Sequence, residues 1–467
     1  MMKYEGNQIT DIKIAYIGGG SRAWAWKLMN DLVICDDISG EVALYDIDLE
    51  AARKNEQLGN QYNKLSEAKS VWNYKAVERI EDALTGADFV VMSILPATLN
   101  EMESDVHAPE KYGIYQSVGD TVGPGGVIRA MRCVPMYEYI AESIKTYCPD
   151  AWVINYTNPM TLCTRTLYRV FPGIKAFGCC HEVYGTQEFL AYMVENLFHV
   201  ENVAREEIKV NVISVNHFTW LTQAVWKNID LIPYFRTLCE KCRYGYESES
   251  EEDAWMASEK VKEVTLMMDL FLRFGYIPAA GRKHLMEFCE GKWYLENPER
   301  VKEINSYMVS VESRKKGYQE NLDKSARLLS GEEELHVGQT GEEGVLQIRA
   351  LLGLCDLVTN VNLPNRGQIP NLPLGAVVET NAVFRAGSLV PVLAGPIPTS
   401  LYPSVARICG QQEALSEAIA QRDLEKIFTV FANDPLTTCG LADARKLFKE
   451  MCENTKDYLT MYDFSNF

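Results

Sequence analysis

The sequence has no excess of basic residues, no long apolar run and no regular cysteine framework. Its 46 Lys and Arg residues are outnumbered by 64 Asp and Glu residues, which gives a net charge of −18. Nucleic acids and anionic membranes both require a basic face, so neither is an expected partner. An anionic small substrate remains compatible with this charge, because it needs only one or two local cations.

The chain also lacks the marks of export. No apolar run approaches the length of a membrane span, and the polar N-terminal stretch has no apolar core. The 13 cysteines are an odd number and are scattered along the chain. We therefore expect reduced thiols in a cytoplasmic protein. The 467 residues are enough for two large domains, and no repeat or low-complexity segment interrupts them.

A dinucleotide-binding pattern stands near the start of the chain. The apolar strand predicted at Ile12–Ile17 leads into a turn made of Gly18, Gly19, Gly20 and Ser21. A helix is predicted next, at Trp24–Leu32, and the arrangement fits G-x-G-x-x-A. Glycines let the backbone approach a pyrophosphate, and the helix N-terminus offers N–H groups to it. Alone, the pattern also fits a plain strand–helix connection.

A second predicted strand, Glu41–Asp46, ends in an acid. An acid at this place accepts hydrogen bonds from the adenosine ribose and repels a 2′-phosphate, so Asp46 favours NAD over NADP. The spacing from the glycines is longer than usual, which leaves Asp48 as a rival for this role. Alternatively, Asp46 caps the helix predicted at Leu49–Leu58.

Further buried strands are predicted at Ala87–Ile94, Trp152–Tyr156 and Lys175–Cys179. Strands that alternate with helices predict an α/β fold, with a Rossmann dinucleotide-binding domain over residues 11–179 and a second domain over residues 180–467. In such sheets ligands bind at the carboxyl ends of the strands. We therefore expect Ser93, Asn158 and Cys180 to face one crevice with Gly18.

Two candidate metal ligands follow predicted strands. Cys180 opens the sequence Cys-His-Glu-Val, and a thiolate beside an imidazole could hold a metal next to a cofactor. The alternative is a buried cysteine that only packs. His217 follows the strand predicted at Ile208–Val215, and its alternative is a satisfied core histidine.

Three other segments carry weaker signals. Gly119–Gly126 is glycine-rich and contains Asp120 ahead of Arg129, although a flexible connection would look the same. Val361–Pro373 holds several prolines and predicts an extended surface segment without regular structure. The two acids Glu342 and Glu343 are expected to lie exposed in a loop.

Together the motifs resemble glycoside hydrolase family 4, the NAD- and Mn-dependent glycosidases. The resemblance covers most of the chain and is carried by Gly18–Ser21, Leu44–Asp48, Asp120–Gly126, Asn158–Pro159, Cys180–His181, Asn216–Phe218, Val361–Gly367 and Asp434–Leu436. It implies a Rossmann domain followed by an α+β, lactate-dehydrogenase-like catalytic domain. It also implies NAD, a divalent ion, usually Mn²⁺, held by Cys180 and His217, and a homo-oligomer, either a dimer or a tetramer.

The resemblance also suggests the substrate, a glycoside or oligosaccharide. The Cys-His-Glu-Val form resembles the α-galacturonidase subgroup, with the family's α-glucosidases, α-galactosidases and α-glucuronidases as alternatives. Binding a uronic acid in so acidic a chain requires a local cation, and Arg282, Arg129 and Arg366 are candidates. Relatives that act on neutral sugars place an acid where this chain has Arg282 and Lys283.

The family mechanism implied here oxidises sugar C3, removes the acidified C2 proton, breaks C1–O by elimination, adds water and returns the hydride. His181 or Glu182 would protonate the leaving oxygen. Asn158 would bind sugar hydroxyls near the nicotinamide, and Asp120 would contact substrate or organise its loop. The base is left open among Lys283, His284 and a nearby tyrosine such as Tyr276.

Two functions of other kinds fit the same architecture. An NAD-dependent hydroxy-acid dehydrogenase would need no metal and would accumulate NADH. A non-catalytic NAD sensor would need neither Cys180 nor His217 at a strand end, so these two residues argue against it.

Overall fold

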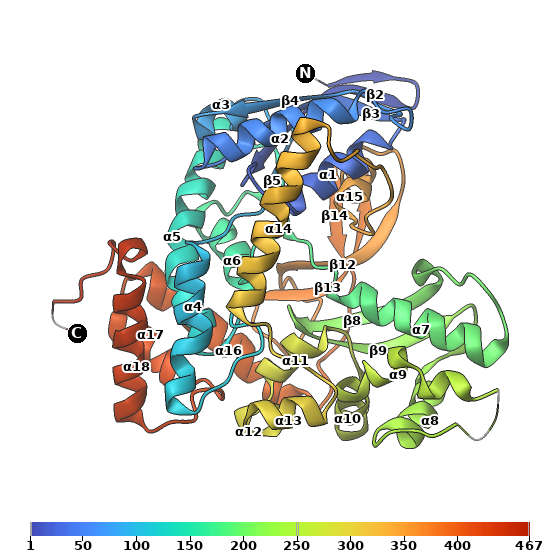
Figure 1. Ribbon diagram of the computed structural model, residues 1–467, viewed down its shortest axis with the longest axis vertical. Coiled ribbons are helices and arrows are strands. Elements are labelled where there is room, and N and C mark those ends of the chain that lie inside the picture. The colour runs from blue at the N-terminus through green and yellow to red at the C-terminus, as the bar shows by residue number, and fades with distance from the viewer. Residues whose placement is uncertain (1, 249, 251, 466) are drawn as a thin grey trace.

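The computed structural model describes residues 2–248, 250, 252–465 and 467. Within them the largest element is a ten-stranded sheet with helices on both faces (Figure 1). Its parallel centre has the order β4-β3-β2-β5-β6-β7, which is the Rossmann order when strands are counted along the chain from β2. The predicted dinucleotide-binding fold is therefore confirmed. These strands are β2 (Gln8–Ile17), β3 (Ile38–Tyr45), β4 (Trp72–Val77), β5 (Phe89–Met92), β6 (Trp152–Asn155) and β7 (Lys175–Gly178).

Both faces of the parallel strands are buried, which explains why their sequences are nearly continuous apolar runs. Ile14 and Val91 belong to the apolar core beneath α1 (Trp24–Val33), α2 (Leu49–Tyr62) and α15 (Gly344–Leu351). Ala15 and Val90 belong to the core on the opposite face, beneath α3 (Ile80–Leu84), α5 (Gly123–Tyr147) and α6 (Met160–Val170).

The sheet continues past the predicted domain boundary at residue 180. β12 (Leu357–Pro364) pairs antiparallel with β7, and β13 (Val377–Arg385) and β14 (Ser388–Pro391) extend it further, while β1 (Lys3–Glu5) pairs with β2. The division into two domains remains a prediction. The expectation that Val361–Pro373 lacks regular structure is wrong for its first four residues. They are buried in β12, because Pro364 is the last residue of the strand and does not interrupt it.

The rest of the chain after β7 combines helices with a second sheet, which agrees with the predicted α+β character. A smaller antiparallel sheet holds β8 (Ile208–Val215), β9 (Phe218–Trp226), β10 (Ile229–Asp230) and β11 (Ile277–Pro278). β8 also lies against β13 of the main sheet, so the two sheets share one packed interior. Around this sheet lie α7 (Glu182–Phe198), η2 (Arg205–Glu207), α8 (Ile232–Cys242), η3 (Ala254–Ala257), α9 (Glu259–Lys262), α10 (Thr265–Phe274), α11 (Arg282–Phe288), α12 (Gly291–Tyr294) and α13 (Pro298–Glu303).

The remaining helices cover the side of the molecule near α5. α16 (Tyr402–Ala420), α17 (Leu424–Ala432) and α18 (Leu441–Asn454) contact α5, and η4 (Lys456–Tyr458) follows them (Figure 1). α4 (Leu99–His107) leads into η1 (Ala108–Tyr112), and α14 (Val311–Ser330) runs beside α4 and α2. No helix in the described ranges is both long enough and apolar enough to cross a membrane.

Candidate active site

The glycine turn between β2 and α1 has a geometry that only glycine can adopt at its first position. Gly18 has φ +95°, and a Cβ there would overlap the carbonyl oxygen of Ser93, which follows β5. The N–H groups of Gly18 and Gly19 both donate to the Tyr45 carbonyl at 2.9 Å. Ser21 Oγ accepts from the Trp24 N–H at 3.1 Å, which fixes the start of α1. The turn and Ser93 thus come together as expected.

The two acids after β3 have separate tasks. Asp46 accepts from the Gly20 N–H at 2.8 Å and from the Asp48 N–H at 2.9 Å, so it holds the glycine turn against β3. Burial raises the pKa of Asp46. Asp48 caps α2 by accepting from the Ala51 N–H at 3.0 Å. The capping alternative considered for Asp46 therefore applies to Asp48.

Asp120, His217 and His284 form a cluster whose ligand atoms all lie within 4.8 Å of one another. His217 sits with φ +63° in the turn that joins β8 to β9, and His284 comes from α11. The two imidazole rings stack with centroids 3.7 Å apart. Thr121 Oγ1 lies 3.2 Å from His217 Nδ1, which orients the ring. The cluster offers one oxygen and two nitrogen donors, a set that suits a borderline divalent ion.

The protonation states of the cluster suit metal binding. Burial lowers the pKa of His217 to about 3 and that of His284 to about 4. Burial alone would raise the pKa of Asp120, but His284, Arg129 and His217 outweigh it and hold that pKa well below its usual range. At neutral pH the carboxylate is therefore charged and both imidazoles are neutral, as metal ligands must be.

Cys180 does not belong to the three-residue cluster found among the described residues. It is buried after β7, and its carbonyl accepts from Asn360 Nδ2 at 3.1 Å. The same amide donates to Glu379 Oε1 at 2.7 Å, and Asn216 Nδ2 donates to Glu379 Oε2 at 3.1 Å. Glu379, which is 1% exposed, therefore links the backbone of Cys180 to the residue before His217.

His181 and Glu182, which begin α7, face different neighbours. His181 Nδ1 lies 3.5 Å from Glu342 Oε1, and Glu342 raises the pKa of this imidazole. Glu182 accepts from the Gly281 N–H, and its other oxygen lies 3.8 Å from His284 Nε2. Glu182 thus reaches the edge of the cluster, whereas His181 points to the segment before α15.

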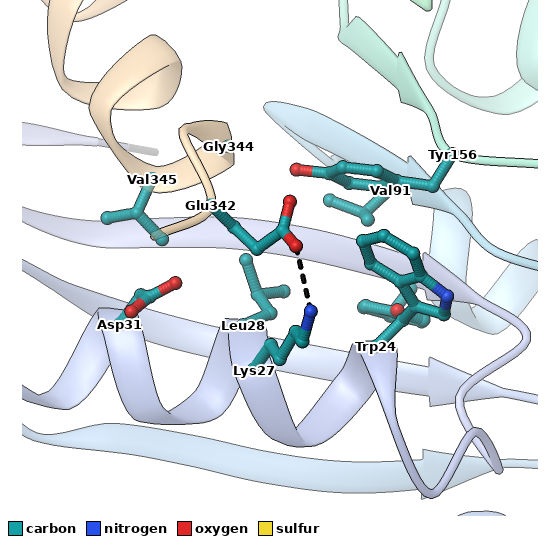
Figure 2. A pocket seen from close by; sticks show the side chains of 10 residues that line it. Trp24, Lys27, Leu28, Asp31, Val91, Tyr156, Glu342, Gly344 and Val345 are labelled. Carbon is teal, nitrogen blue, oxygen red and sulfur yellow. Dashed lines mark hydrogen bonds and ion pairs between the residues drawn. The ribbon is translucent and has the colours of Figure 1, made fainter. Parts of the chain in front are cut away.

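The acids of that segment are buried, so the expectation of exposed loop charge at Glu342–Glu343 is wrong. Figure 2 shows the small pocket between α1 and the segment before α15, where Glu342 faces Lys27 beside Trp24 and Tyr156. Lys27 Nζ lies 2.8 Å from Glu342, and Arg205 donates to Glu343 at 2.9 Å. The charges can be buried because each acid has a basic partner from another element.

Asn158 connects the cluster to the sheet. Its Nδ2 lies 3.5 Å from Asp120 Oδ2, and its carbonyl accepts from Arg129 Nε at 3.0 Å. Its Oδ1 is buried and has no partner among the described residues. An unpaired acceptor beside the cluster is what a sugar hydroxyl would satisfy.

Several predicted residues lie elsewhere or are already paired. Lys283 Nζ lies 4.9 Å from the centroid of the Tyr307 ring, and Arg282 contacts that ring and Glu263. Arg366 is exposed, and its backbone N–H donates to Gln368. Tyr276 is half-buried and precedes β11.

The loop that carries Asp120 is rigidly held, contrary to the flexible alternative. Residues 123–126 form the first turn of α5, and a Cβ on Gly126 would come within 2.5 Å of the Thr121 backbone. Glu287 from α11 accepts from the N–H groups of Val118 and Gly119 at 2.7 and 2.8 Å. Sequence reasoning missed Glu287, although its position three residues after His284 on one helix was an available signal.

Known proteins resemble this chain over nearly its whole length. The model of the family 4 glycosyl hydrolases matches residues 13–196, and that of the family's C-terminal domain matches residues 212–437. An α-galacturonidase of Thermoanaerobacterium saccharolyticum is 55% identical over 461 residues, which are 98% of each chain.

Two solved structures extend the comparison. A Bacillus subtilis protein described as a glucosidase is 48% identical, with a TM-score of 0.87 over 95% of this chain and 100% of that chain. A 6-phospho-α-glucosidase from gut microorganisms, solved with NAD and Mn²⁺, is 19% identical, with a TM-score of 0.78 over 96% of this chain and 99% of that chain. At that identity the second likeness concerns the fold alone.

Proposed function

The chain belongs to family 4 of the glycosyl hydrolases, and we propose that within this family it hydrolyses terminal α-linked galacturonides. The observation that carries the proposal is the 55% identity to an α-galacturonidase over 98% of both chains. The Cys180–Val183 sequence supports the same subgroup. The competing description is the glucosidase name of the Bacillus subtilis structure, which is a weaker match at 48% identity.

NAD and Mn²⁺ are the proposed cofactors, and this chain's residues fit both. The Gly18–Ser21 turn and Asp46 would hold NAD, which supplies a reversible hydride acceptor. His217, Cys180 and Asp120 would hold the metal, which supplies Lewis acidity for charge that develops on the sugar oxygens. The structural neighbour solved with NAD and Mn²⁺ supports this pairing through the shared fold.

The chain's own residues would then position and protonate the sugar. Asn158 would donate to and accept from hydroxyls between Asp120 and the glycine turn. His284, which faces Glu182 at 3.8 Å, is the proposed base for the C2 proton, and Glu182 would stabilise the imidazolium that forms. His181, held by Glu342, is the proposed acid for the leaving oxygen.

The substrate is tested with four chromogenic glycosides. We expect kcat/KM for 4-nitrophenyl α-galacturonide to exceed that for the α-galactoside and the α-glucoside by at least about 10²-fold, because a site built for a charged group loses that much when the group is missing. The α-glucuronide keeps the C6 carboxylate, and we expect it to react more slowly because its C4 hydroxyl is inverted. The measurement is initial rate with NAD and Mn²⁺ present. Faster turnover of a neutral glycoside would rule out the proposed substrate.

Glu379 should stabilise the metal site without touching the metal. Glu379→Gln replaces one acceptor oxygen by a donor, which then faces an amide donor of Asn216 or Asn360. We expect Mn²⁺ to bind about 10- to 100-fold more weakly, measured by titration calorimetry. Glu425→Gln, which removes an exposed partner of Arg445, is the matched control and should bind Mn²⁺ normally. Unchanged Mn²⁺ affinity in Glu379→Gln would exclude a role of Glu379 in stabilising the metal site.

A further inference from the structure

A galacturonide carries a carboxylate at C6, and the site must hold a cation that is free to meet it. The arginine that the sequence favoured does not qualify, because Arg282 already contacts Glu263 and the Tyr307 ring. Arg366 is exposed, and its charge lowers the pKa of Tyr168 on α6, although burial raises that pKa more. A different guanidinium, near the cluster of Asp120, His217 and His284, forms no ion pair within the described residues.

That guanidinium is Arg314, in the first turn of α14. α14 runs beside α4, with this turn on the side of α11 (Figure 1). One terminal nitrogen of Arg314 lies 3.5 Å from the Val118 carbonyl, two residues before Asp120. Its Nε is buried and has no hydrogen-bond partner in the described part of the chain. The residue is half-buried, so the guanidinium is partly withdrawn from bulk water while its buried Nε stays unpaired.

The charges around Arg314 leave positive charge in excess. Burial lowers the pKa of the Arg314 guanidinium, the Asp120 carboxylate raises it and the Arg129 charge lowers it. The Asp120 carboxylate therefore interacts with both arginines. Within the described ranges neither arginine forms an ion pair at 4.0 Å or less. Glu287, the other nearby acid, has a pKa raised to about 8 by burial and is mostly neutral at pH 7. Two guanidiniums thus share one carboxylate, which favours entry of a second anion.

We propose that Arg314, with Arg129 beside it, binds the C6 carboxylate of the substrate and thereby sets the preference for uronic acids. The inference rests on the proposed galacturonidase function. A planar guanidinium meets a carboxylate through two parallel hydrogen bonds, which a compact ammonium cannot reproduce. A neutral sugar with a hydroxymethyl group at C6 would leave the positive charge uncompensated.

The test compares two substrates in two variants of the full-length enzyme with NAD and Mn²⁺. Arg314→Gln should lower kcat/KM for 4-nitrophenyl α-galacturonide on the order of 10²-fold. It should leave kcat/KM for the α-galactoside within about 3-fold or raise it, since no carboxylate is lost there. Arg314→Lys keeps the charge but cannot form the two parallel hydrogen bonds of a guanidinium, so its fall in kcat/KM for the galacturonide should be intermediate. Inhibition by free galacturonate should be strongest in wild type, weaker in Arg314→Lys and weakest in Arg314→Gln.

Arg327→Gln is the matched control, because Arg327 lies on the same helix and pairs with Glu333 at the surface. It should preserve both activities. Equal losses on both substrates in Arg314→Gln would show a structural role and overturn the inference, as would an unchanged preference. A wild type that prefers the galactoside would overturn the proposed function itself, an outcome visible before any variant is measured.

Discussion

Replacing His217 with alanine is expected to lower kcat/KM for the galacturonide by at least about 10³-fold. The imidazole is 3% exposed at the tip of the β8–β9 turn, and its ring is oriented by Thr121 and stacked on His284. Its loss would remove a nitrogen donor from the metal site, and the Lewis acidity at stake is worth several kcal/mol. The measurement is initial rate at saturating NAD over a range of Mn²⁺ concentrations, together with Mn²⁺ titration.

His336→Ala is the control, since His336 is exposed, and it should behave as wild type. Cys180→Ser, measured alongside, separates two ligand sets. A loss comparable to that of His217→Ala supports the pair Cys180 and His217, whereas a small loss leaves Asp120, His217 and His284 as the ligands. Full activity of His217→Ala would exclude a metal site at this cluster.

Gly18→Ala is expected to weaken NAD binding by about 10²-fold or more, with a matching loss of hydrolysis. The left-handed backbone at φ +95° disfavours any side chain, and the added methyl would overlap the Ser93 carbonyl oxygen. Strain of this kind costs about 1–3 kcal/mol from the backbone alone, and the overlap adds to it. NAD affinity by calorimetry and thermal unfolding with and without NAD are the readouts.

Gly410→Ala is the control for this substitution. Gly410 lies within α16, has no neighbouring atom within 4 Å of an added Cβ, and should tolerate or gain from alanine. NAD affinity that is unchanged in Gly18→Ala, with the fold intact, would show that the turn does not contact the cofactor.

The strands that build the nucleotide-binding half could be predicted because their apolar runs are long and regular. β8 was predicted at its observed bounds from alternation alone, and with it the position of His217 at a strand end. By contrast, the meeting of Asp120 with His284 could not be predicted, because it depends on how α11 packs against the loop before α5. Local patterns carry no information about such distant contacts.

Charges withdrawn from solvent were the hardest feature to predict. Glu342, Glu379 and Arg314 look like ordinary surface residues in sequence, because nothing near them along the chain shows what covers them. Lys27 from α1 covers Glu342, and Glu379 is enclosed by the amides of Asn360 in β12 and of Asn216 in the β8–β9 turn. Arg314 is only half-buried and has no ion-pair partner among the described residues, so a role for it is suggested only once the surrounding charges are known.

We propose that this family 4 enzyme cleaves galacturonides by oxidation and elimination, a route that would remove and replace the proton at sugar C2. The most direct test is hydrolysis of 4-nitrophenyl α-galacturonide in D₂O, with NMR of the galacturonate released early in the reaction. We expect one deuterium at C2 of each product molecule and no net NADH. Product that keeps its original proton at C2 would contradict it.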